Sequence, residues 1–211
     1  MIDLTQGNLL EADVEALVNT VNCVGVMGKG IALQFKHAFP DNFRQYKRAC
    51  RAREVRLGQM FIVATGQLNN PKYIINFPTK NHWRGKSRIE DIESGLAALV
   101  CDVERLNIRS IAIPALGCSN GGLEWSDVAP RITAAFENIP TVKALLYEPF
   151  GAPEATSMPV ATDKPALTRA RALLLKLFEL YRIPGYRLTL LEIQKLAYFL
   201  QESGEPLDCA M

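Results

Sequence analysis

Apolar positions in the first 150 residues follow two periods, one typical of strands and one typical of helices. Short β-branched runs predict strands at residues 2–4, 16–22, 59–65, 72–77, 110–114 and 141–147. Apolar residues spaced by three or four predict helices at residues 28–37, 41–50, 89–106 and 126–138. Ser126 is the expected N-cap of the last helix. This alternation favours a mixed α/β sheet with right-handed crossovers and helices on its faces.

Three of these segments carry more detail. The run at residues 16–22 is apolar almost throughout, as in a strand that is buried on both faces. A turn signal separates the runs at 59–65 and 72–77, which predicts a hairpin-like pair. The polar residues 78–88 predict an irregular segment before the next helix.

The composition changes after residue 150. Pro, Ala, Ser and Thr dominate residues 151–164, which predicts a linker, and two helical patterns follow at 166–181 and 188–200. Two helices make a poor independent core. We therefore expect a domain at residues 1–150 and, at 165–211, the start of a small helical domain that continues in the natural protein. The second helix could be a core helix of that domain or a contact for a partner protein.

Two glycine-rich turns each follow a predicted strand. Gly25, Gly28 and Gly30 follow the strand at 16–22, and the sequence LGCSNGGL at 116–123 follows the strand at 110–114. Glycines allow close approach of an anion, and a helix N-terminus favours negative charge. Ligands of α/β sheets bind at the carboxyl ends of the strands. The two turns therefore predict a diphosphate held from two sides.

The first turn does not fit a Walker A motif, although Lys29 follows a glycine. The position of the motif's first glycine is occupied by Cys23, and the position of its Ser or Thr by Gly30. A nucleoside-triphosphatase loop is therefore excluded.

Charge and composition exclude several classes of protein. The net charge is +2 and no run of five like charges occurs, so no strong non-specific nucleic-acid or membrane patch is expected, although a local groove could be basic. No segment has 18 consecutive apolar residues and the N-terminus lacks a signal pattern, so we expect a soluble cytoplasmic protein without membrane contact. Five scattered cysteines and two histidines predict no disulfide framework, no metal site and no cofactor.

Four motifs in order resemble the macrodomain family over residues 1–150. They are GNLL at 7–10, VNTVNCVGVMGKGIALQF at 18–35, PTK at 78–80 and PALGCSNGGLEW at 114–125. Within the family, the chain is most similar to the DarG antitoxins, whose macrodomain removes ADP-ribose from thymine bases in single-stranded DNA. The resemblance implies the macrodomain fold, ADP-ribose and ADP-ribosylated single-stranded DNA as partners, and a cognate DNA ADP-ribosyltransferase toxin that the protein counteracts.

The resemblance also assigns the ligand-binding residues. Asn8, where many members have aspartate, and Leu9 lie by the adenine, with Tyr147 stacking nearby, and Asn22 faces the distal ribose. The diphosphate contacts are Gly28, Lys29, Gly30, Ile31 and Ala32 on one side, and Cys118, Ser119, Asn120, Gly121, Gly122 and Leu123 on the other.

By the same resemblance, catalysis falls on Lys80. In a related human glycohydrolase a lysine in this motif attacks the anomeric carbon, and an aspartate assists from the place where this chain has Gly121. A lysine is nucleophilic only when it is neutral, and partial burial at a strand end lowers its pKa. Attack at the ribose would expel the thymine ring nitrogen as a delocalised anion, so weak acid assistance could suffice.

Several of these residues also have simpler interpretations. Lys80 and Lys29 could be solvated loop lysines, and Trp83 could cover a core edge. Cys118 fits a small buried thiol better than a nucleophile, because no histidine is placed to activate it. Carboxylates such as Glu124 and Asp127 are favoured at a helix start without any catalytic role.

His82, Trp83 and Arg84 offer a titratable group, a base-stacking surface and a phosphate partner for single-stranded DNA. The leading hypothesis is therefore a DNA ADP-ribosyl glycohydrolase that acts as an antitoxin. Two alternatives stay open: a module that binds ADP-ribose without cleaving it, and a hydrolase of ester-linked ADP-ribose on proteins or of O-acetyl-ADP-ribose.

Overall fold

The computed structural model describes residues 1–149, 159–161, 166–181 and 188–205. The chain divides into two compact units, Met1–Thr162 and Asp163–Met211. Apart from residues 159–161, which have no regular structure, the predicted linker at 151–164 lies outside the described residues.

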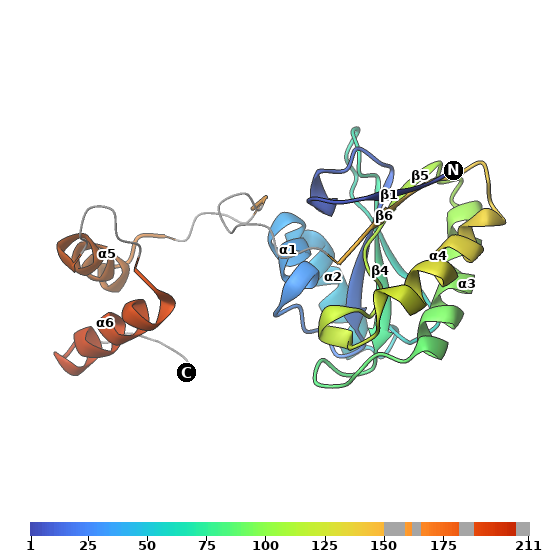
Figure 1. Ribbon diagram of the computed structural model, residues 1–211. Helices are drawn as coiled ribbons and strands as arrows, with labels where there is room; N and C mark the ends of the chain where they lie inside the picture. Colours follow the sequence, from blue (N-terminus) through green and yellow to red (C-terminus); the bar gives the residue numbers. More distant parts are fainter. Residues whose placement is uncertain (150–158, 162–165, 182–187, 206–211) are drawn as a thin grey trace. The chain divides into compact units, whose positions relative to one another are not determined.

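The first unit is built on one six-stranded sheet (Figure 1). Its strands are β1 (Ile2–Thr5), β2 (Ala16–Asn22), β3 (Phe61–Ala64), β4 (Tyr73–Lys80), β5 (Ser110–Ile113) and β6 (Lys143–Tyr147). They lie in the order β1-β6-β5-β2-β4-β3, and all neighbouring strands are parallel except the antiparallel pair β3 and β4. The predicted mixed sheet and the hairpin-like pair are confirmed.

Helices cover both faces of this sheet (Figure 1). The helices are α1 (Gly30–Ala38), α2 (Pro40–Arg51), α3 (Ile89–Arg105) and α4 (Trp125–Glu137), with short 3-10 turns η1 (Leu9–Glu11) and η2 (Ser119–Gly121). Side chains alternate across a strand, so Val18 of β2 joins the core under α3 and α4 whereas Leu17 joins the core under α1. Burial on both faces explains the continuous apolar run of β2.

Two local predictions are corrected by the structure. Strand β4 does not end at Phe77 but continues to Lys80, because β2 keeps pairing with it through a register shift at Asn22. Pro78 is tolerated there because β3 pairs with β4 only as far as Asn76, which leaves the outer side of this stretch without a strand neighbour. Helix α4 begins at Trp125, so Ser126 lies inside the helix and is not its N-cap.

The parallel register brings five carboxyl strand ends to one edge of the sheet. Strands β1, β6, β5, β2 and β4 all run in the same direction, so the residues that follow them lie together. Both glycine-rich turns leave from this edge, one after β2 and one after β5.

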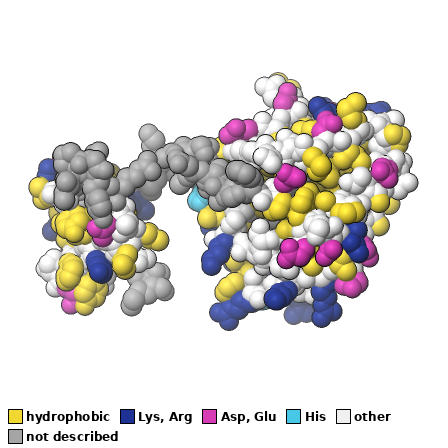
Figure 2. All heavy atoms as spheres, in the orientation of Figure 1, with side chains coloured by type: hydrophobic (Ala, Val, Ile, Leu, Met, Phe, Trp, Pro, Cys, Tyr) yellow, Lys and Arg dark blue, Asp and Glu magenta, His cyan; other side chains and the backbone are white. Residues whose placement is uncertain are grey.

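The second unit consists, in its described part, of α5 (Arg169–Tyr181) and α6 (Leu190–Glu202). Thr189 and Glu192 form a capping box that starts α6. Apolar side chains are exposed on both helices, including Leu180 and Phe199 (Figure 2). No helix in the described parts of the chain combines the length and apolar character needed to span a membrane.

Gly95 sets the distance between α3 and the sheet. A Cβ atom on Gly95 would lie 2.3 Å from Cζ of the buried Phe77. Overpacking of this kind costs up to about 3 kcal/mol, against a helix-propensity gain of about 1 kcal/mol. We expect Gly95→Ala to lower the free energy of unfolding by about 2 kcal/mol in urea titrations.

The matched control is Gly28→Ala, whose new Cβ would meet nothing closer than 3.8 Å. Its stability should stay within about 0.5 kcal/mol of the unsubstituted protein. Equal stability of the two variants would show that α3 can move away from β4 at no cost.

Candidate functional site

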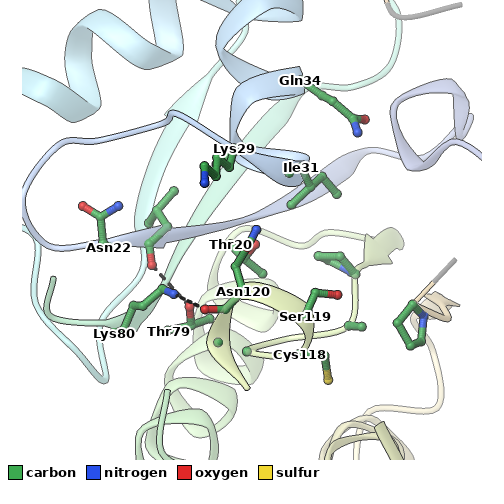
Figure 3. Close-up of a pocket in the computed structure, with 18 of the residues that line it drawn as sticks. Thr20, Asn22, Lys29, Ile31, Gln34, Thr79, Lys80, Cys118, Ser119 and Asn120 are labelled. Atoms are coloured by element: carbon green, nitrogen blue, oxygen red, sulfur yellow. Dashed lines mark hydrogen bonds between the residues drawn. The ribbon is translucent and has the colours of Figure 1, made fainter. Parts of the chain in front are cut away.

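A cleft of about 740 Å³ opens at the edge where the five strands end, a volume typical of small-molecule sites (Figure 3). Most of the predicted site residues line it, namely Asn8, Leu9, Asn22, Gly28, Lys29, Gly30, Ile31, Ala32, Lys80, Trp83, Arg84, Cys118, Ser119, Asn120, Gly121 and Tyr147. Three predicted residues, His82, Gly122 and Leu123, do not line it.

Sequence reasoning missed other residues of the lining. They are Gly7, Thr20, Val21, Val26, Gln34, Thr79, Pro114, Ala115, Gly117, Glu148 and Pro149. Most of them lie at or just after the carboxyl ends of parallel strands, so the predicted topology contained the signal for them. Gln34 is different, because only its polar character beside the apolar Phe35 marks it in the sequence.

The first glycine turn is organised by the side chain of Asn22. Its Oδ1 accepts hydrogen bonds from the backbone N–H groups of Val24, at 3.1 Å, and Val26, at 3.3 Å. Its Nδ2 donates to the carbonyl oxygen of Val26 at 2.6 Å, and the buried Tyr46 hydroxyl donates to the carbonyl oxygen of Asn22. The side chain of Asn22 therefore fixes the backbone conformation of the turn, in addition to lining the cleft.

A buried amide network lies behind this turn. Asn19 Nδ2 donates to Oδ1 of Asn76 at 3.0 Å, and Asn76 Nδ2 donates to Oδ1 of Asn42 at 2.7 Å. All three residues are at most 2% exposed. The network joins β2, β4 and α2, and it accounts for the polar interruption at Asn19 in an otherwise apolar strand. Among the described residues, the amides of Asn42 and Asn76 bond each other in both directions, whereas Oδ1 of Asn19 is buried without a partner.

The second glycine turn adopts left-handed backbone conformations. Gly117 and Gly122 have φ angles of 70° and 81°, and Ser119 has 54°. The Leu123 N–H donates to the carbonyl oxygen of Gly117 at 3.2 Å, which closes the turn. A Cβ atom on Gly117 would lie 2.8 Å from Cδ1 of Leu123, so glycine is required there.

The two turns face each other across the cleft. A Cβ atom on Gly30 would lie 3.2 Å from Nδ2 of Asn120, so the start of α1 lies against the second turn. The free N–H groups at the start of α1 provide a positive helix end, and the exposed Lys29 adds a charge beside it. This arrangement suits a diphosphate, as the two turns predict.

Lys80 lies between the turns at the end of β4 (Figure 3). Its Nζ donates to the backbone carbonyl of Asn120 at 2.7 Å, so the amine points toward the second turn. Partial burial lowers the pKa of this amine. In the described part of the chain no three His, Cys, Asp or Glu side chains gather to hold a metal ion.

Packing crowds residue 121, where the resemblance places an assisting aspartate. A Cβ atom on Gly121 would lie 2.5 Å from Oγ of Ser87, which is itself buried. The Ser87 N–H also donates to the carbonyl oxygen of Gly121 at 2.9 Å. The absence of a carboxylate at residue 121 is therefore built into the surroundings of the turn.

The far end of the cleft is apolar. Leu9, Ile31 and Tyr147 belong to one hydrophobic cluster there. Asn8 uses its side chain locally, since Oδ1 accepts from the Leu10 N–H at 3.1 Å and Nδ2 donates to Glu11 at 2.9 Å. Three strand spacings separate the ends of β6 and β4, roughly 14 Å.

An exposed cationic and aromatic pair lies beside Lys80. The Arg84 guanidinium carbon lies 4.6 Å from the ring centroid of Trp83, and Trp83 is 46% exposed. The His82 ring also lies near Trp83, with 5.5 Å between ring centroids. Trp83 and Arg84 line the same cleft as Lys80, so the cleft presents a flat ring and a cation together with the amine.

Comparisons with known proteins identify the family. The family model described as Macro domain matches residues 18–132, more than half of the chain. The chain belongs to the macrodomain family.

Individual relatives and solved structures show which members of the family this chain resembles. A protein of Thermus aquaticus named DNA ADP-ribosyl glycohydrolase is 56% identical over 97% of this chain and 57% of its own length. A Thermosipho africanus protein named as a fusion of DNA ADP-ribosyl transferase and DNA ADP-ribosyl glycohydrolase is 38% identical over 61% of this chain and 37% of its own length. The chain thus spans less than two thirds of these relatives.

The structure of the Mycobacterium tuberculosis DarG macrodomain matches with a TM-score of 0.71 and 56% identity, covering 71% of this chain and 99% of the other. Thermosipho africanus DarTG in complex with ADP-ribose matches with a TM-score of 0.64 and 33% identity, covering 74% of this chain and 45% of the other. The predicted macrodomain resemblance and fold are confirmed.

The reactivity of Cys118 tests the raised pKa of its buried thiol. Burial raises the pKa of this thiol to about 11, so about one part in a thousand is thiolate at pH 8. We expect iodoacetamide at pH 8 to leave Cys118 unlabelled in the folded protein while the exposed Cys101 is modified, as measured by peptide mass spectrometry. Rapid labelling of Cys118 would contradict its assignment as an inert buried thiol.

Proposed function

We propose that this chain is a DNA ADP-ribosyl glycohydrolase that removes ADP-ribose from thymidine in single-stranded DNA. It would thereby act as the antitoxin of a DNA ADP-ribosyltransferase and restore the modified DNA. The observation that carries the proposal is the amine of Lys80, held between two glycine turns by the carbonyl of Asn120. The names of the relatives, including a fusion with a transferase, support the same activity and partner.

The geometry supports one orientation of ADP-ribose in the cleft. The diphosphate lies against the start of α1 and the second turn, which meet at Gly30 and Asn120, and the adenine enters the apolar end formed by Leu9, Ile31 and Tyr147. The proximal ribose then reaches Lys80, since the roughly 14 Å between these ends suits an extended nucleotide sugar.

The proposed chemistry takes place at C1 of the proximal ribose. Neutral Lys80 acts there either as the nucleophile or as the base that activates water, and the bond to the thymine ring nitrogen breaks. The leaving base carries the electron pair as a delocalised anion and then takes a proton. If Lys80 is the nucleophile, water then hydrolyses the bond between its Nζ and C1, which releases ADP-ribose and the free amine. Because this anion is a good leaving group, the reaction needs little help from an acid, which accords with the glycine at residue 121.

Trp83 and Arg84 support DNA as the carrier of the ADP-ribose. An exposed indole stacks on any nucleobase, and a guanidinium pairs with a backbone phosphate. Both side chains line the same cleft as Lys80, so a modified strand bound at the cleft can reach them. Such a substrate, together with four unpaired cysteines among the described residues, also supports a cytoplasmic location.

One observation favours a second candidate, a module that binds ADP-ribose without cleaving it. Residue 121 carries no carboxylate, and Ser87 fills the space that one would need. The two candidates share the cleft and differ only in turnover.

The deciding experiment compares Lys80→Ala with the unsubstituted protein on a thymidine-ADP-ribosylated oligonucleotide and on a protein carrying glutamate-linked ADP-ribose. We expect DNA to be the preferred substrate, and loss of Lys80 to lower its rate at least a hundredfold, about the least that a proton-transferring or attacking group contributes. Released ADP-ribose is the measured quantity.

The control is Lys143→Ala, an exposed lysine at the opposite edge of the sheet, which should keep full activity. Release from neither substrate by the unsubstituted protein would leave only the binding module, and equal rates with and without Lys80 would remove its catalytic role.

The pH dependence follows from the burial of Lys80. Burial lowers the pKa of the amine below its ordinary value of 10.5, so the reactive neutral form grows as pH rises and becomes saturated above that lowered pKa. Single-turnover rates should therefore rise about tenfold per pH unit below the lowered pKa and level off before pH 10.5. A rate that does not change between pH 6 and 9 would show that the rate-limiting step does not depend on deprotonation of Lys80.

A further inference from the structure

Gln34 is a buried polar residue on the cleft side of α1. It is 7% exposed, and its neighbour in the helix, Phe35, is part of the apolar core. Gln34 lines the cleft, and Figure 3 shows its carboxamide extending from α1 on the side of Ile31.

The carboxamide of Gln34 has no hydrogen-bond partner among the described residues, whereas the amides of Asn22, Asn42 and Asn76 each make side-chain hydrogen bonds. The amide atoms of Gln34 are open to the cleft. A ligand that supplies one donor and one acceptor can therefore bind this preformed polar group directly.

The position of Gln34 identifies the part of the ligand it meets. It lies one helical turn from Ile31, which packs with Leu9 and Tyr147 at the apolar end of the cleft. These side chains form walls for a flat aromatic ring.

Two other polar side chains near this end make local hydrogen bonds. Asn8 is bonded to Leu10 and Glu11, and Glu148 accepts a hydrogen bond from Gln6 at 2.9 Å. Among the described residues at this end, Gln34 is thus a side-chain amide that remains available to a base.

We propose that Gln34 reads the adenine of the bound nucleotide, with Oε1 accepting from the 6-amino group and Nε2 donating to a neighbouring ring nitrogen. A carboxamide matches this donor and acceptor pair of adenine in a bidentate way. Gln34 is then the residue that determines base specificity. This inference rests on the proposed function, because it requires ADP-ribose in the cleft.

The test measures binding of ADP-ribose and of its analogue with unsubstituted purine in place of adenine, by calorimetry. The analogue lacks the 6-amino donor, and one hydrogen bond is worth about 0.5–1.5 kcal/mol, roughly a threefold to tenfold change in affinity. The unsubstituted protein should bind ADP-ribose more tightly than the analogue by that factor. Gln34→Met, which keeps the volume but has no amide, should bind both equally.

Gln45→Leu, on the exposed face of α2, is the matched control and should keep the preference. If Gln34→Met fails to fold, Gln34→Asn provides the same comparison, since its shorter side chain keeps the polarity and withdraws the amide from the base. A merely structural role would lower affinity for both ligands and leave their ratio unchanged.

The outcomes separate the two proposals. A preference that survives in Gln34→Met overturns the role of Gln34, and so does equal binding of both ligands by the unsubstituted protein, while the proposed function stands. Binding of neither ligand by the unsubstituted protein overturns the proposed function itself.

Discussion

Parallel strand register is the constraint on which the site depends. Backbone pairing in β1, β6, β5, β2 and β4 aligns five strand ends, so residues more than a hundred positions apart in the chain meet at one edge. The cleft is therefore not made by any one motif. The glycine turns, the amine of Lys80 and the apolar end occupy successive positions along that edge because the strand order places them there.

Much of this arrangement could be predicted from the sequence. Apolar periodicity gave β2 with its observed bounds, because a strand buried on both faces leaves an uninterrupted signal. The start of α4 was missed because Ser126 fits an N-cap by type, while the closing of the second glycine turn starts the helix earlier. The end of β4 was missed because pairing with a distant strand outweighed the polar local sequence.

Site residues could be predicted where residue type and position along a strand decide the role, but not where the role depends on packing. The glycines of the turns and the lysine at the strand end belong to the first group. Gln34 and Ser87 do not, since each acquires its importance from what surrounds it: an amide left without a partner in one case and a filled space in the other. The local bonds of Asn22 were likewise invisible, because they join residues of a turn whose shape is known only once it is folded.

The contact between residues 87 and 121 also constrains how the chain can evolve. A first side-chain carbon at residue 121 would lie 2.5 Å from Oγ and 3.2 Å from Cβ of Ser87, so Ser87 must turn away or be replaced before residue 121 can carry a side chain. Residues in such contact do not change independently, so the effect of a substitution at residue 121 depends on which residue stands at position 87.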